Sequence, residues 1–330
     1  MSTVTWGRMF GLAEEILALE PWKKLEEELV FAIQPHVDGP VYFASVMGRM
    51  GEHHAVAYYK GNEGFSYFRR AQLGEESSRI GMEGLLMSEH LQVAFEPRKN
   101  LLATDLELLK ACGKRYRGKW PVFRTQRPAR MPWTASPAEA ADLAILMEHT
   151  LAVFHRLKRG ENLLRPYFSE DIVLIDSEGR DSKCRVADFP QTRHILKVSL
   201  PHGALDGIPR SSLRLEMEVA LMISPINDVP KGEPPYMPLI LLAVDADSGM
   251  IIGFDTLDTR EGLDSAFVKM PDAINQILKK ANLVPKRIAA RHAILFSALE
   301  AYGKFYGIEI EETDDLPQAD AAVEHLMNFM

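Results

Sequence analysis

Apolar residues along the chain form short continuous runs that alternate with stretches of helical period. In the first half, the runs at 29–35, 41–48 and 54–61 are rich in Val, Phe and Tyr and are bounded by turn residues, which predicts three strands. A helical period ahead of them ends at Pro21. The elements expected after them are a partly helical stretch at 63–90, a strand at 91–97, a helix at 104–117, a strand at 121–128 and a helix at 136–157.

The helix at 136–157 has the clearest start signal in the chain. Ser136 is followed by Pro137 at the first helical position and by Glu139 three residues after the serine. This spacing predicts a capping box, in which the serine and glutamate side chains bond each other's backbone N–H groups.

The same order of elements returns from residue 213 onward. Strands are expected at 213–225, 238–249 and 250–257, and then a helix at 265–282 interrupted near Pro271, a strand at 286–292, a helix at 294–306, a strand at 308–312 and a final helix from Pro317. The predicted fold class is therefore α/β, with two tandem βββαβαβα units. We place the domains at 1–158 and 213–330, with a connector of short strands at 159–212.

Two octets support an internal repeat. LKACGKRY at 109–116 and LEAYGKFY at 299–306 share Leu, Ala, Gly, Lys and Tyr at identical offsets. Gly113 and Gly303 fall on the apolar face of their helices, where a missing side chain would allow close approach to a sheet. Gly118 and Gly307 are expected to end the helices. Chance similarity between two amphipathic helices is the alternative explanation.

Three strands followed by helix, strand, helix, strand and helix resemble the ribonuclease H-like fold. The resemblance implies that each half is a mixed five-stranded sheet flanked by helices. It rests on the order and length of elements over roughly 29–158 and 213–330, and other mixed-sheet α/β folds share a similar order.

The chain is also similar to a bacterial two-part protein family of unknown function. The similarity rests on PW (21–22), the strand pair VYFASVMG (41–48) and HAVAYYKG (54–61) with GEHH (51–54) between them, RGKWPVFRTQRP (117–128), MPW (131–133) and LLAVDADSGMIIG (241–253). It implies a two-part protein and carries no activity or catalytic residue. At 127–133 the sequence RPARMPW has Ala129 and Arg130 where a Pro-Gly-aromatic turn is expected.

Charge is distributed unevenly along the 330 residues. The segment 305–330 has seven acidic residues and no Lys or Arg, and removing those seven charges from the net charge of −8 leaves −1 for residues 1–304. Conversely, residues 110–130 hold eight basic residues and no acidic one, with aromatic residues between them.

This basic-aromatic stretch predicts a surface for nucleic acid or for an acidic protein, because attraction between charged groups is local and screened within about 10 Å. A solvated helix face without a partner is the alternative. A further possibility is that the acidic C-terminal segment occupies this surface, in the same molecule or in a neighbour. The predicted contact residues are Lys114, Arg115, Arg117, Lys119, Trp120, Arg124, Arg127 and Arg130.

Candidate catalytic chemistry is sparse. Ribonuclease H-like nucleases hold two divalent metals with carboxylates from the first strand, the first helix and the fourth strand. Here the runs 29–35 and 286–292 have no acidic residue. The leading hypothesis is a non-catalytic binding or scaffold module. The alternative is a metal-dependent phosphodiester hydrolase that would use Asp245, Asp247 and Asp255.

Several kinds of site are excluded by the residues that the sequence lacks. Two cysteines exclude a disulfide framework and a multi-cysteine zinc site, and without a glycine-rich phosphate loop no nucleotide cofactor is expected. The longest apolar run, 238–244, is too short to cross a membrane, and acidic residues come early at the N-terminus, so a cytoplasmic protein is expected. The proline-rich segment 231–238 is either a loop that a partner recognises or a link between two strands.

Overall fold

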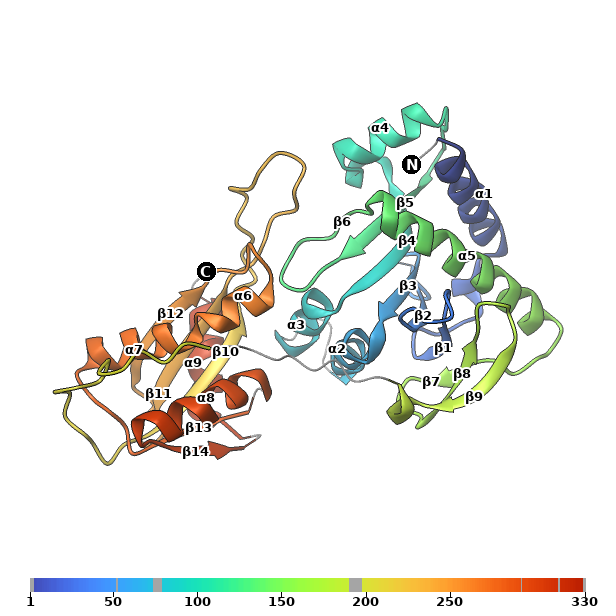
Figure 1. Ribbon diagram of the computed structural model, residues 1–330. Helices are drawn as coiled ribbons and strands as arrows, with labels where there is room; N and C mark the ends of the chain where they lie inside the picture. Colours follow the sequence, from blue (N-terminus) through green and yellow to red (C-terminus); the bar gives the residue numbers. More distant parts are fainter. Residues whose placement is uncertain are drawn as a thin grey trace. The chain divides into compact units, whose positions relative to one another are not determined.

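A computed structural model describes residues 3–51, 53–73, 79–189, 198–291, 293–313 and 315–328 (Figure 1). The chain forms two units. Unit 1 comprises Met1–Arg127 and Pro132–Thr192, and unit 2 comprises Pro128–Met131 and Arg193–Met330. Both units are α/β, each with one mixed sheet flanked by helices, so the predicted fold class is confirmed.

Within the described residues, the sheet of unit 1 has nine strands in the order β6-β5-β4-β3-β2-β1-β8-β9, with β7 paired to β1. All of its pairings are antiparallel except that of β1 with β8. The strands are β1 (Leu29–Ile33), β2 (Tyr42–Met47), β3 (Ala55–Lys60), β4 (His90–Pro97), β5 (Lys119–Gln126), β6 (Trp133–Thr134), β7 (Arg165–Pro166), β8 (Asp171–Ile175) and β9 (Asp181–Arg185).

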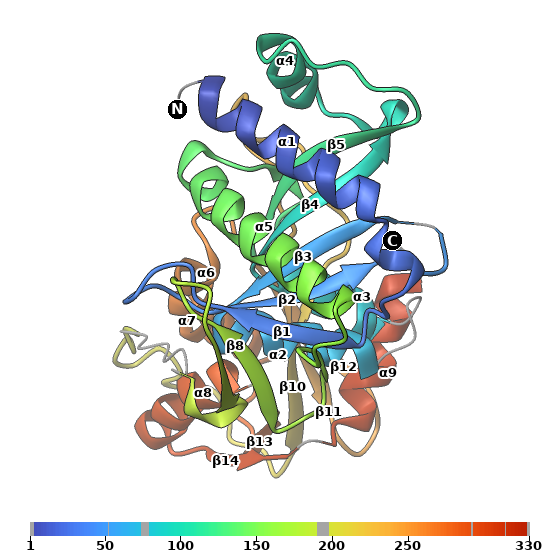
Figure 2. The same ribbon diagram turned by 90° about the vertical axis from the view of Figure 1, so that its right-hand side faces the viewer.

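Helices cover both faces of this sheet, which explains why its central strands are continuous apolar runs. On β3, Tyr58 packs on one face and Tyr59 on the other, and both are fully buried. Helices α1 (Thr3–Leu19) and α5 (Pro137–Lys158) lie side by side over the Tyr58 face (Figure 2). The other elements are α2 (Gly61–Leu73), α3 (Arg79–Met87), α4 (Ala103–Ala111) and the short 3₁₀ helices η1 (Pro21–Lys23), η2 (Arg98–Asn100) and η3 (Val186–Asp188).

The predicted start of α5 is confirmed. The Ser136 hydroxyl accepts a bond from the Glu139 backbone N–H at 3.4 Å, and the Glu139 carboxylate accepts one from the Ser136 N–H at 2.7 Å. Both halves of the capping box are therefore present.

The described part of unit 2 has a five-stranded sheet in the order β12-β11-β10-β13-β14. Strand β10 is antiparallel to β11 and parallel to β13. Helix α9 covers one face and helices α6 to α8 lie on the other (Figures 1 and 2). The elements are β10 (Arg214–Leu221), β11 (Leu239–Asp245), β12 (Ile251–Leu257), α6 (Leu263–Val268), α7 (Met270–Ala281), β13 (Arg287–Ala290), α8 (Ala293–Tyr306), β14 (Glu309–Glu312) and α9 (Pro317–Asn328).

The predicted order of elements is found in both units, but the strands pair differently. In unit 1, β4 returns antiparallel beside β3, because α2 and α3 form a helical hairpin that brings the chain back to the same edge. In unit 2, α6 and α7 carry the chain across the sheet, so that β13 pairs parallel with β10. The two sheets therefore do not share one topology, and the expected five-stranded sheet is wrong for unit 1, which has nine strands.

The segment expected to be a connector contributes to the first sheet. Strands β7, β8 and β9 fall within 159–212, and β8 extends the sheet beyond β1. Unit 1 accordingly continues to Thr192.

The two matched glycines have different roles. At Gly303, inside α8, an added Cβ would lie 2.4 Å from Cγ1 of Ile310 and 2.6 Å from the backbone oxygen of Ile308, so the expected close approach is confirmed there. Gly113 has φ +63 and open space around its missing Cβ. It follows the end of α4 at Ala111, in the left-handed conformation typical of a helix C-terminus, so the close-approach prediction is wrong for Gly113.

We expect Gly303→Ala to destabilise the protein by about 1–3 kcal/mol, because the overpacking against a backbone oxygen outweighs the gain in helix propensity. Gly11→Ala in α1 is the matched control, since no atom lies within 4 Å of its added Cβ. That variant should be stabilised by up to about 1 kcal/mol. Urea denaturation of both variants measures the difference, and equal stability would contradict the close packing of Gly303.

Residues 128–131 leave unit 1 and pair with the proline-rich segment in unit 2. The Met131 N–H donates to the Pro235 carbonyl at 2.9 Å, and the Met237 N–H donates to the Ala129 carbonyl at 2.8 Å. Ala129 is fully buried with φ +57, a conformation that favours glycine, at the place where a glycine-containing turn was expected. The segment 231–238 thus binds a stretch of its own chain.

Candidate functional site

The eight predicted contact residues occupy different surroundings, and Arg124 on β5 is buried. Its guanidinium donates two hydrogen bonds to the Asp105 carboxylate, at 2.5 and 2.6 Å, and the two side chains are only 9% and 4% exposed. Thr134 also donates to Asp105, at 3.2 Å. Arg124 therefore belongs to a buried ion pair and does not face solvent.

Three further predicted residues are engaged by neighbouring groups. Lys114 pairs with Glu14 of α1 at 2.7 Å, and Arg127 pairs with Glu139 at 3.1 Å. Arg130 lies in unit 2, where its guanidinium donates to the backbone oxygens of Pro234 and Arg260.

The other predicted residues lie at one end of the sheet of unit 1. Pro97 at the end of β4 pairs with Lys119 at the start of β5, so the residues after Pro97 and those before Lys119 leave the sheet together. Trp22 of η1 reaches the same place, because the Lys119 ammonium lies 5.6 Å from the centre of its ring. We define the cationic end of unit 1 as Lys24, Arg98, Lys99, Arg115, Arg117 and Lys119.

The charges of the cationic end are not neutralised by ion pairs. Within the part of the chain that the structure describes, no carboxylate forms an ion pair with any of the six side chains. Five of the six residues are exposed, and Lys119 is half-buried. Partial burial lowers the pKa of the Lys119 ammonium, because desolvation disfavours its charged form and outweighs the opposing charge of Glu20, which is itself paired with Lys23.

Aromatic rings hold two of these cations. Trp22 is buried, with the ring of His54 stacked on it at 4.5 Å, and His54 Nε2 lies 3.4 Å from Lys119 Nζ. The Arg98 guanidinium lies 5.8 Å from the centre of the Trp120 ring. Both distances to the ring centres are within the range of cation–π attraction.

A histidine–glutamate pair lies beside this end. His53 Nδ1 is 3.1 Å from the Glu96 carboxylate, and the Gln92 amide contacts the other ring nitrogen at 2.8 Å. The hydrogen bond from His53 lowers the pKa of Glu96. Asn100 also donates to Glu96, at 2.8 Å. Glu96 is thus held by His53 and Asn100 and forms no ion pair with the cationic end.

The three aspartates of the alternative metal site do not converge. Asp245 ends β11 and accepts from the Ser248 hydroxyl in the turn that follows, which lowers the pKa of its carboxyl. Asp255 on β12 pairs opposite Leu241. That position is four residues from Asp245 along β11, or roughly 13 Å at about 3.3 Å per residue. Among the described residues, no group of three or more His, Cys, Asp or Glu could hold a metal ion.

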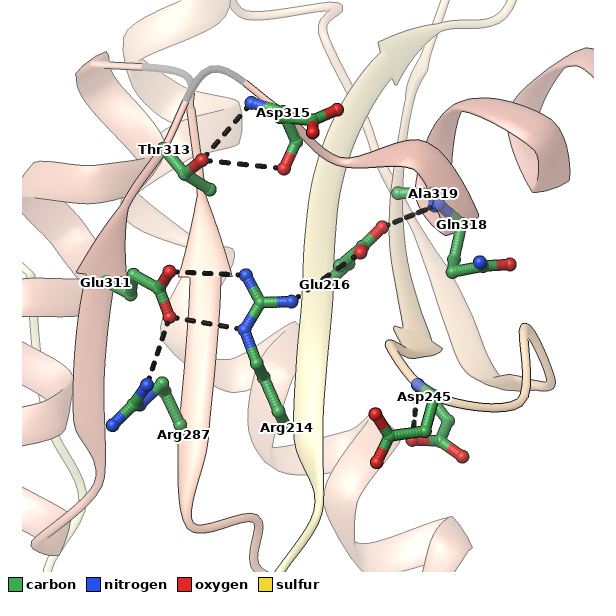
Figure 3. A network of polar contacts seen from close by, with 10 residues as sticks. Arg214, Glu216, Asp245, Arg287, Glu311, Thr313, Asp315, Gln318 and Ala319 are labelled. Atoms are coloured by element: carbon green, nitrogen blue, oxygen red, sulfur yellow. Dashed lines mark hydrogen bonds and ion pairs between the residues drawn. The ribbon is translucent and has the colours of Figure 1, made fainter.

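Buried carboxylates of unit 2 instead bind the chain itself. Glu216 on β10 is 1% exposed and accepts the backbone N–H groups of Gln318 and Ala319, at 2.8 and 2.9 Å, so it caps the N-terminus of α9 (Figure 3). Figure 3 also shows Arg214 between Glu216 and Glu311, with Asp245 apart from this network.

Arg291, directly after β13, lies between two further carboxylates. Its guanidinium is 2.5 Å from Glu218 of β10 and 3.0 Å from Asp320 of α9. The hydrogen bond to Asp320 and the charge of Glu218 raise the pKa of Arg291. Glu309 pairs with Arg287 at 2.8 Å. Three acidic residues of the C-terminal segment, Glu309, Glu311 and Asp320, are therefore paired with arginines of their own unit, and Asp314 lies outside the described residues.

Comparison with protein families assigns the N-terminal part. A family model described as a domain of unknown function (DUF7309) matches residues 6–174, just over half of the chain. The chain belongs to this family. A second model, a domain of unknown function (DUF6930), matches residues 205–327. Searches of curated proteins and of solved structures found no match.

The two matches support the predicted two-part organisation. All six residues of the cationic end lie within the DUF7309 match, whereas the carboxylates around α9 lie within the DUF6930 match. Residues 128–131 are also within the DUF7309 match, although they fold into unit 2. The described helices of this DUF7309 protein include none that is long and apolar enough to span a membrane.

Sequence reasoning missed Lys24, Arg98, Lys99, Glu216 and Arg291. Arg98 and Lys99 stand outside the basic run at 110–130, and only the pairing of Pro97 with Lys119 brings them to it. Glu216 and Glu218 could have been recognised from the sequence. They are two residues apart in an apolar strand of the DUF6930 match, so they lie on the same face, and two buried charges on one face predict partner groups nearby.

Proposed function

We propose that this protein is a non-catalytic binding module and that the cationic end of unit 1 binds a polyanion. The observation that carries the proposal is the group of six basic side chains, none of which forms an ion pair with a carboxylate among the described residues. A concentration of unneutralised charge raises the local concentration of an oppositely charged partner. This surface replaces the eight-residue prediction, because Arg124 is buried and Arg130 belongs to unit 2.

The arrangement of unit 2 supports a non-catalytic role. We infer a ribonuclease H-like topology from its strand order, in which the first strand, β10, lies between β11 and the fourth strand, β13. In metal-dependent enzymes of that fold, carboxylates of these two strands hold metal ions. Here Arg291 follows the fourth strand and pairs with Glu218 of the first strand. A guanidinium in that place neutralises the carboxylate that would otherwise attract a cation.

The proposal predicts that the triple variant Lys99→Gln, Arg115→Gln and Arg117→Gln loses at least about tenfold in heparin affinity at low salt, because three charge contacts are removed. These side chains are exposed and have no ion pair within the described residues, so folding should be unchanged. Fluorescence anisotropy of labelled heparin against full-length protein measures the effect.

The matched control is Arg180→Gln, Lys183→Gln and Arg185→Gln, around β9 at the far edge of the same sheet. It removes the same number of charges from exposed side chains. Heparin affinity should fall much less in the control. Equal losses in the two variants, or no binding by the unmodified protein, would refute the proposed function.

A further inference from the structure

The aromatic rings of the cationic end are already in use by the protein itself. Trp22 is 3% exposed, with His54 stacked on its ring and Lys119 over it. The Trp120 ring has the Arg98 guanidinium over it and Tyr116 edge-on at 5.8 Å. Tyr116 donates its hydroxyl to Glu14 at 2.7 Å. Trp22 is therefore buried under its neighbours, and the partly buried Trp120 already has a cation of the protein over its ring, so a nucleobase would have to displace Arg98 from that position.

The state of these rings matters because proteins bind single-stranded and duplex nucleic acids through different interactions. Proteins that prefer single strands stack unpaired bases on exposed aromatic rings. Proteins that bind by charge alone respond to the density of phosphates, which is higher along a duplex, with one charge per about 1.7 Å of helix axis. A surface whose tryptophan rings are buried or already in contact with a cation therefore gains mainly from phosphates.

The rings also order the cations. A lysine or arginine over an aromatic ring gives up fewer rotamers when it binds, because the ring already restricts it. Arg98 and Lys119 are restricted in this way, while Arg115 and Arg117 are free of ion pairs within the described residues. Guanidinium groups match the geometry of phosphate oxygens with two parallel hydrogen bonds.

We propose that the polyanion bound by the cationic end is a nucleic-acid duplex, contacted through its phosphate backbone without base readout. The inference rests on the proposed function and adds the class of partner. An acidic protein surface is the less favoured partner, because its carboxylates are more widely spaced than the phosphates of a duplex.

The test uses full-length protein and three labelled probes: a 20-base-pair DNA duplex, a 20-nucleotide single strand and heparin. We expect the duplex to bind several-fold more tightly than the single strand in fluorescence anisotropy, with equal affinity for AT-rich and GC-rich duplexes. The affinity should fall steeply with salt, and Arg117→Gln should reduce the salt slope by about one. Tryptophan emission should not be quenched when the single strand is added.

The outcomes separate the two proposals. Tighter binding of the single strand with quenched tryptophan emission, abolished in Trp120→Leu, would overturn the duplex inference and leave polyanion binding intact. Binding of heparin without binding of either DNA would do the same and point to another class of polyanion. Failure to bind any of the three probes would refute the proposed function itself.

Discussion

Replacing Arg124 by alanine is expected to lower the free energy of unfolding of unit 1 by about 3–5 kcal/mol. The Asp105 carboxylate is 4% exposed, and its charge is balanced by the two hydrogen bonds from Arg124. After the substitution it keeps the Leu102 N–H at 2.8 Å and the Thr134 hydroxyl, neither of which carries charge. A buried charge without a counter-charge is among the largest single destabilising effects.

Tryptophan fluorescence during urea denaturation measures this loss in unit 1 alone. All four tryptophans (Trp6, Trp22, Trp120 and Trp133) belong to that unit. Arg127→Ala is the control, since its pair with Glu139 is exposed on the arginine side and should contribute at most about 1 kcal/mol. The double variant Arg124→Met with Asp105→Leu should recover much of the stability. Similar losses of stability in Arg124→Ala and Arg127→Ala would contradict the expectation that Arg124→Ala leaves the buried charge of Asp105 without a counter-charge.

Replacing Arg291 by alanine is expected to cost unit 2 about 3–5 kcal/mol, because it leaves Glu218, 5% exposed, without its counter-charge. The same substitution removes the ion pair to Asp320, so α9 loses a contact with the sheet. The backbone amide hydrogens of α9 should then exchange faster with solvent. These include the N–H groups of Gln318 and Ala319, which donate to the Glu216 carboxylate.

Hydrogen exchange with mass spectrometry, followed over peptides of α9, measures this effect. The control is Arg287→Ala, whose pair with Glu309 is exposed on both sides and should contribute at most about 1 kcal/mol. The tryptophan-reported transition of unit 1 should not change in either variant. Unaltered protection of α9 in Arg291→Ala would contradict the role assigned to this arginine.

The elements of the fold were predictable from local patterns, and their pairing was not. The capping box at Ser136 and the break near Pro271 depend on neighbouring residues, and the structure has both. Whether β4 pairs with β3 or crosses to β1 depends on the path of the intervening helices. The helical hairpin of α2 and α3 reverses the chain through packing between residues far apart in sequence, which periodicity does not reveal.

The candidate site shows the same limit. A run of basic residues indicates a concentration of positive charge, but it does not indicate which of these residues form ion pairs within the protein. Arg124 is buried because Asp105, 19 residues earlier, arrives from α4 with its carboxylate. Arg98 joins the surface because strand register places it beside Trp120. The octet shared by the two halves led to a wrong prediction for Gly113 because a glycine's neighbours in the folded chain decide its role. Gly303 packs closely against Ile308 and Ile310, whereas no atom lies within 4 Å of a Cβ added to Gly113.

Because residues 128–131 fold with unit 2, they affect where the chain can be cut to produce the second unit alone. A fragment starting at residue 205, where the second family match begins, would keep the backbone groups of Pro235 and Met237 but lose Met131 and Ala129, to which they bond. Open backbone donors and acceptors of this kind invite pairing with other chains. Truncated versions intended for biochemistry should therefore supply the missing tetrapeptide, for instance by a short linker, before poor solubility is attributed to the fragment's own fold.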